Sequence, residues 1–235
     1  MEADISSSWI TIESANGGSF NAFVSLPPSG FGPGLMVLQE IYGVNEHIRS
    51  ICEQFALDGF VAVAPDIFWR QESLVDLSYD DDGLKKGLNF FSNLNINLAA
   101  ADLQRTVEAI RHIPSCSGKV GSVGFCMGGL LSFVAAARAG VETSVSYYAT
   151  RLEQHSSFID DITCPILFHF AENDQHVDSK VVREIERSFQ GKDCRIVVHK
   201  NANHGFNCWR RQSWDQAASA KARGQTLVHL MESLA

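Results

Sequence analysis

Residues 122–129 read Ser-Val-Gly-Phe-Cys-Met-Gly-Gly, and the Gly-x-Cys-x-Gly pattern around Cys126 decides the fold class. The run from Val120 to Gly124 is typical of a buried strand, and the apolar run 129–137 is typical of a helix. Glycines two residues before and two residues after the cysteine leave room for a sharp strand-to-helix turn, where side chains would collide. The pattern therefore predicts a nucleophile elbow that holds the thiol at the carboxyl edge of a sheet. A buried structural cysteine is the alternative, since free cysteine is often buried.

An elbow nucleophile needs an acid and a histidine later in the chain, in that order, and the sequence contains both. Asp174 follows the apolar run 165–170, and His204 follows the strand-like run 195–199. Because parallel strands open their carboxyl ends on one side of a sheet, Cys126, Asp174 and His204 are expected to converge. His204 would take the thiol proton and later activate water, while Asp174 would fix the imidazole tautomer.

Other histidines and acids compete for these roles. His169 and His199 fall inside strand-like runs, and His176 lies in the same loop as the candidate acid. Their positions favour packing or surface roles. The rival acids, Glu172 and Asp178, rank below that candidate.

The chain resembles the dienelactone hydrolase (carboxymethylenebutenolidase) family of the α/β-hydrolases over nearly all of its 235 residues. The matching stretches are Gln39-Glu40-Ile41-Tyr42-Gly43-Val44-Asn45, Ala64-Pro65-Asp66-Ile67-Phe68, Gly124-Phe125-Cys126-Met127-Gly128-Gly129, and the loops that hold Asp174 and His204. With the elbow, the resemblance predicts an α/β-hydrolase fold in a single domain, 1–235, with a mostly parallel central sheet and helices on both faces. It implies hydrolysis of enol lactones or activated esters.

The loop after the first core strand, 35–39, is where an α/β-hydrolase places one oxyanion-hole amide. We assign that amide to Ile41 and the other to Met127, the residue after the nucleophile. The resemblance implies that Glu40 contacts the resting Cys126 thiol and moves when substrate binds. A solvated carboxylate at a strand end is the alternative for Glu40.

A sulfur nucleophile also restricts the substrate. A thiolate, whose parent pKa is about 8.5, leaves a tetrahedral intermediate more readily than an alkoxide does, so alkyl esters and amides tend to revert to substrate. Enol lactones, activated aryl esters and thioesters release a stabilised anion and avoid this reversal. The reaction would proceed through a thioester acyl-enzyme.

The chain departs from the family where the substrate is selected. Family members hold the substrate carboxylate with two arginines, one before the helix that precedes the elbow strand and one four residues after the catalytic histidine. Here Cys208 occupies the second position, and the first segment, 79–86, contains no arginine. Lys85, Arg210 and Arg211 lie nearby and are candidates for a shifted carboxylate site. A solvated surface is the alternative for the adjacent arginines.

Composition restricts the partners. The net charge of −8 argues against nucleic acid or a membrane surface as partner. The resemblance implies a small lactone or ester as the partner. Residues 1–16 lack a signal-peptide pattern, and no run approaches the roughly 20 apolar residues of a membrane span. The sequence contains no Cys-x-x-Cys or His-x-x-x-His motif that would predict a metal site, and we expect no cofactor. Six cysteines without paired spacing, one of them a candidate nucleophile, favour the reducing cytoplasm. The oligomeric state stays open.

The remaining segments complete the picture. Residues 9–11 and 20–25 read as an opening hairpin, and 216–231 as a closing helix. Segment 71–97 combines an acidic patch with weak periodicity, which favours a mobile flap near the site entrance. Two other functions stay open: a carboxylesterase or thioesterase acting on a different acyl group, and a non-catalytic thiol sensor.

Overall fold

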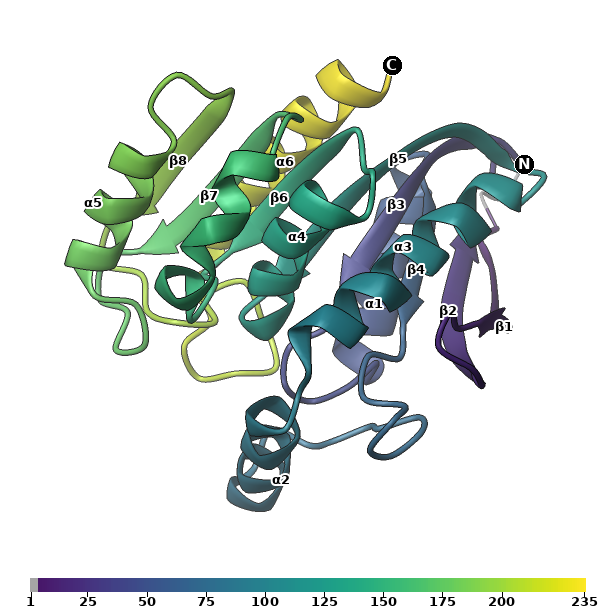
Figure 1. The fold of residues 1–235 in the computed structure, drawn as a ribbon, viewed down its shortest axis with the longest axis horizontal. Helices are drawn as coiled ribbons and strands as arrows, with labels where there is room; N and C mark the ends of the chain where they lie inside the picture. Colours follow the sequence, from purple (N-terminus) through teal and green to yellow (C-terminus); the bar gives the residue numbers. More distant parts are fainter. Residues whose placement is uncertain (1–3) are drawn as a thin grey trace.

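The computed structural model describes residues 4–235 and has one eight-stranded sheet at its centre (Figure 1). Its elements are β1 (Ser6–Glu13), β2 (Ser19–Leu26), β3 (Gly32–Leu38), α1 (Glu46–Leu57), β4 (Val61–Pro65), α2 (Asp81–Ser92), α3 (Ile96–His112), β5 (Cys116–Phe125), α4 (Met127–Arg138), β6 (Thr143–Tyr147), the 3₁₀ segment η1 (Leu152–Asp161), β7 (Ile166–Ala171), α5 (Ser179–Ser188), β8 (Cys194–His199) and α6 (Gln216–Leu234).

The sheet is mostly parallel. Its order is β1-β2-β4-β3-β5-β6-β7-β8. The β1–β2 and β2–β4 pairs are antiparallel, whereas each neighbouring pair from β4 through β8 is parallel. The predicted opening hairpin and the α/β-hydrolase type of sheet are therefore confirmed, and the parallel strands end on the same edge.

Helices cover both faces of the sheet, and each face has its own apolar core. On β3, Met36 and Leu38 belong to the core under α3 and α4, while Leu35 and Val37 belong to the core under α1 and α6. A strand buried on both faces explains why this stretch reads as a continuous apolar run. Within residues 4–235, no helix is both long enough and apolar enough to cross a bilayer.

The segment expected to be a mobile flap contains a regular helix. Helix α2 lies beyond the carboxyl ends of the strands, at the bottom of Figure 1, and Asp80 caps it by accepting a hydrogen bond from the Gly83 N–H at 2.8 Å. A Cβ at Gly87 would lie 2.5 Å from the Ile41 carbonyl oxygen. The helix uses glycine to approach a loop closely, and glycine in a helix interior lowers the local helix propensity.

Candidate active site

The elbow at Cys126 has the geometry that its sequence predicts. Cys126 joins β5 to α4 with φ 56° and ψ −114°, a conformation that residues other than glycine rarely adopt. Its N–H donates to the Tyr147 carbonyl at 3.0 Å, which ties the turn to the end of β6. A Cβ at Gly124 would lie 1.8 Å from the Gly128 carbonyl oxygen, and one at Gly128 would lie 2.2 Å from the Leu38 carbonyl oxygen. The turn therefore needs glycine on both sides of the cysteine.

Asp174 and His204 meet at the same edge of the sheet. His204 Nδ1 lies 2.8 Å from Asp174 Oδ2, and both side chains are almost fully buried. The second carboxylate oxygen accepts the His176 backbone N–H at 2.8 Å. The Asn173 N–H donates to the Ala202 carbonyl at 2.9 Å, which joins the loop after β7 to the loop after β8. These contacts fix the Asp174 carboxylate so that it orients the His204 ring.

The electrostatic environment of His204 favours its charged form. Burial by itself would lower the pKa of His204, but the charge of the neighbouring Cys126 thiolate and the hydrogen bond with Asp174 raise that pKa to about 10. An imidazolium is therefore stable beside Cys126 whenever the sulfur is a thiolate. This is the charge distribution that a thiol nucleophile with a histidine base requires.

The competing acids have other structural partners. Glu172 accepts the Asn201 N–H at 2.8 Å, and Asp178 caps α5 through the Lys180 N–H at 2.8 Å. Each carboxylate thus stabilises a loop or a helix end away from the imidazole of His204.

The competing histidines fall into two groups. His169 and His199 are buried and lie against each other, with 3.1 Å between ring nitrogens, which agrees with a packing role. His176 differs from a simple surface residue, because its ring meets the His204 ring edge-on with centroids 4.8 Å apart and lines the cavity beside Cys126. It forms part of the wall of the candidate site.

The backbone amides proposed for the oxyanion hole lie on both sides of the nucleophile. Met127 is the first residue of α4, and Ile41 lies in the loop after β3 and lines the cavity. Within residues 4–235, neither N–H donates a hydrogen bond to another backbone group. Both donors are therefore available for an oxygen atom of a bound ester.

Glu40 is buried but does not make the expected contact with the thiol. Its side chain is 1% exposed, and its two oxygens accept hydrogen bonds from the Tyr79 hydroxyl at 3.2 Å and the Arg211 guanidinium at 3.3 Å. Among the described residues, no hydrogen bond joins this carboxylate to Cys126 Sγ. The positive charge of Arg211 competes successfully for Glu40 in this conformation. Because the carboxylate is buried, the solvated alternative for this residue is wrong.

A cavity of about 460 Å³ opens beside Cys126. Its apolar wall consists of Ile41, Tyr42, Leu84, Leu88 and Phe91. Three of these residues come from α2, so the segment 71–97 lies at the site, as the sequence predicts. The polar lining includes His204, His176 and the two arginines Arg151 and Arg211.

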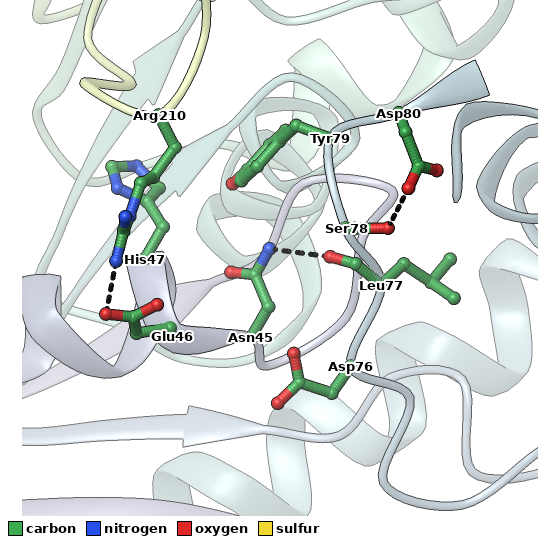
Figure 2. Close-up of a pocket in the computed structure, with 9 residues that line it drawn as sticks. All are labelled: Asn45, Glu46, His47, Asp76, Leu77, Ser78, Tyr79, Asp80 and Arg210. Carbon is green, nitrogen blue, oxygen red and sulfur yellow. Dashed lines mark hydrogen bonds and ion pairs between the residues drawn. The ribbon is translucent and has the colours of Figure 1, made fainter. Parts of the chain in front are cut away.

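The structure separates the three candidate carboxylate-binding residues. Arg211 lines the cavity beside Cys126, where its side chain is about one-fifth exposed. Arg210 lies on a different cavity and pairs with Glu46 (Figure 2). Lys85 is exposed on α2 and is not among the residues that line the Cys126 cavity. Adjacent arginines point to different cavities because the loop turns between them, so of the three candidates only Arg211 is placed to meet a substrate in this cavity.

Arg151 is a candidate site residue that the sequence analysis missed. It follows β6 with φ 62° and ψ 19°, a left-handed conformation that is costly for a residue other than glycine. Its guanidinium lies 3.9 Å from the centroid of the Phe91 ring. Among the described residues, no carboxylate forms an ion pair with it. Its position directly after a strand was the available signal, and the same signal located Asp174 and His204.

Comparisons with known proteins agree with this geometry. The model of the dienelactone hydrolase family matches residues 20–234. Carboxymethylenebutenolidase 1 of Cupriavidus pinatubonensis is 31% identical over 220 residues, covering 93% of this chain and 94% of its own. A Bradyrhizobium protein with an assigned 2-oxo-3-(5-oxofuran-2-ylidene)propanoate lactonase activity is 29% identical and covers 96% of this chain and 94% of its own.

The comparison with solved structures supports the same fold. A Klebsiella pneumoniae structure assigned to the dienelactone hydrolases superposes with a TM-score of 0.86 at 24% identity, covering 97% of this chain and 99% of that one. At this identity the match supports the fold, while the family model and the curated relatives carry the assignment. The chain therefore belongs to the dienelactone hydrolase family and is a hydrolase acting on ester bonds of the lactone type.

Proposed function

We propose that this protein hydrolyses enol lactones and activated esters with Cys126 as the nucleophile, through a thioester acyl-enzyme. The observation that carries the proposal is the position of Cys126 at a strained elbow that opens on the substrate cavity, beside a histidine held by a buried aspartate at 2.8 Å. The proposed partner is a small lactone or ester. Because the reaction needs a free thiol, we also propose a reducing, cytoplasmic location.

The mechanism follows from the charges in the site. The Cys126 thiolate attacks the acyl carbon, and the Ile41 and Met127 N–H groups stabilise the resulting oxyanion. The C–O bond then breaks, the enolate or phenolate leaves, and the His204 imidazolium supplies its proton. His204, now neutral, removes a proton from water, which attacks the thioester and releases the acid and the thiol. Asp174 holds the imidazole in one tautomer throughout.

A matched pair of six-membered lactones tests this function. Dihydrocoumarin releases a phenolate, whereas δ-valerolactone releases an alkoxide. We expect dihydrocoumarin to be favoured by at least roughly 10²-fold in kcat/KM after division by the hydroxide-catalysed rate of each lactone. A thiolate is expelled far ahead of an alkoxide, whereas a phenolate leaves at a rate comparable to that of a thiolate. Equal normalised values would contradict a sulfur nucleophile.

The second part of the proposal concerns the acyl group. The relatives named above have names that describe lactones bearing a carboxylate. In this chain Arg151 and Arg211 line the cavity, but Glu40 already neutralises Arg211. Arg151 has no carboxylate partner among the described residues and is stacked on Phe91, which holds its guanidinium in place. We therefore propose Arg151 as the main carboxylate-binding residue.

Replacing Arg151 with glutamine should reduce activity on anionic esters selectively. We expect kcat/KM for mono-p-nitrophenyl adipate to fall roughly 10- to 100-fold, the value of a charge-assisted hydrogen bond, while that for p-nitrophenyl hexanoate changes little. Both substrates place six acyl carbons in the cavity and differ in the terminal carboxylate. Arg210→Gln is the control, because Arg210 lines another cavity. A parallel loss on both esters would mean that Arg151 acts only in packing.

A further inference from the structure

Three metal-binding side chains meet behind the Glu40 carboxylate. Glu40 comes from the loop after β3, His47 from the first turn of α1, and Cys208 from the loop after His204. All three are buried, and a carboxylate oxygen, an imidazole nitrogen and the sulfur lie within 4.8 Å of one another. The cluster is separate from the proposed triad, and the mechanism uses neither His47 nor Cys208.

The imidazole of His47 has unused hydrogen-bonding capacity. The residue is 1% exposed, and neither ring nitrogen has a hydrogen-bond partner among the described residues. The ring packs edge-on against Trp209, with centroids 4.2 Å apart. One nitrogen of a neutral imidazole carries a lone pair that can bind a metal ion. A buried polar group without a partner is costly, and a ligand that accepts this lone pair would remove the cost.

The other two side chains can complete the coordination. Glu40 uses one oxygen for Arg211 and the other for Tyr79, and each oxygen keeps a further lone pair. The Cys208 sulfur lies within 4.8 Å of a Glu40 carboxylate oxygen. Sulfur, nitrogen and carboxylate oxygen together are the donor set of zinc.

We propose that Glu40, His47 and Cys208 form a binding site for Zn²⁺ or a similar thiophilic divalent cation. Bonds of about 2.0 to 2.3 Å in a tetrahedral arrangement place ligand atoms roughly 3.5 Å apart, so the ligands need to move by about 1 Å. Binding replaces the S–H bond of Cys208 with a sulfur–metal bond and releases the proton to water. Two anionic ligands, the Cys208 thiolate and the Glu40 carboxylate, then face the ion, while Arg211 stays paired with Glu40.

An acidic cavity gives a cation access to this site. A cavity of about 600 Å³ is lined by His47 and Tyr79 on its inner side and by Glu46, Asp76 and Asp80 around it (Figure 2). Arg210 is the cation in its lining, and it is paired with Glu46. Asp76 is likewise paired with Arg49, so Asp80 is the carboxylate of this lining without an ion pair among the described residues. Its charge gives the cavity mouth a negative balance that attracts a divalent cation.

Cobalt and zinc binding test the site directly. The Cys126→Ala protein is used, so that the proposed nucleophile cannot bind the ion. Co²⁺ should bind with a thiolate-to-cobalt charge-transfer band, and Zn²⁺ should displace it at one equivalent. The further variant Cys208→Ser should lose the band, and His47→Phe should weaken zinc binding by more than the roughly 10- to 100-fold that outer-shell partners contribute. Cys116→Ser, at a half-buried cysteine outside the cluster, is the matched control.

Three results would contradict the zinc site. A band that survives in Cys208→Ser, equal zinc affinity in every variant, or no binding by the folded protein would overturn the proposal. If His47→Phe does not fold, the comparison of Cys208→Ser with Cys116→Ser still decides. Because Glu40 also holds Arg211 beside the cavity, zinc should slow hydrolysis by the wild type; this consequence rests on the proposed function, whereas the binding test does not use activity.

Discussion

Replacing Cys126 with alanine is expected to reduce kcat/KM for p-nitrophenyl acetate by at least roughly 10⁴-fold, the loss that removal of a nucleophile causes when binding and the oxyanion hole are retained. We expect no other cysteine to replace Cys126, because Cys126 occupies the elbow itself, directly before α4, in the strained backbone conformation described above. Steady-state release of p-nitrophenol measures the effect. Turnover that persists in the variant would exclude Cys126 as the nucleophile.

The same variant should change the titration of His204. The Cys126 thiolate is the largest contribution that raises the pKa of His204, and burial opposes it. Without the sulfur, the His204 pKa should fall from about 10, which can be followed by NMR of the ring nitrogens. Cys164→Ala is the matched control, because Cys164 is half-buried and its thiol lies against the Ala136 carbonyl at 3.9 Å. It should leave both activity and titration unchanged.

Replacing His204 with glutamine is expected to lower kcat/KM by roughly 10³- to 10⁴-fold, because both the attack and the hydrolysis of the thioester lose their proton acceptor. Glutamine keeps a polar side chain of similar length but cannot take up a proton at neutral pH. The measurement is the rate of p-nitrophenol release, together with mass spectrometry for an acetylated enzyme.

His176→Gln provides the control for this prediction. His176 touches the His204 ring and lines the same cavity, but its link to Asp174 is through the backbone N–H, which the variant keeps. The fall in kcat/KM caused by His176→Gln should be at least tenfold smaller than the fall caused by His204→Gln. A similar loss in both variants would show that the wall of the cavity, and not the base, limits the reaction.

The sequence predicted the features that depend on local pattern. The elbow could be found because a strand-to-helix turn leaves no space for Cβ atoms, so two glycines appear at fixed distances from Cys126. Asp174 and His204 could be found because the carboxyl ends of parallel strands share one edge. Both inferences needed only the chain order and the strand periodicity.

The sequence failed where long-range contacts decide the structure. Helix α2 was missed because Gly87 serves close approach to the Ile41 loop, and glycine has a low intrinsic helix propensity. The side chain that Glu40 contacts was also missed, since Arg211 is distant in sequence and its charge attracts the carboxylate. In the same way, no local rule distinguishes Arg210 from Arg211.

The order of the nucleophile, acid and histidine, the elbow glycines and the strand pattern were determined by the sequence itself, because steric limits and periodicity act between near neighbours. The tertiary structure decided which charges face the cavity beside Cys126: Arg151 and Arg211 line it, whereas Lys85 and Arg210 do not. It also gathered Glu40, His47 and Cys208 into one buried cluster. Pairing of side chains across loops depends on how the whole chain packs, and short-range patterns carry no record of it.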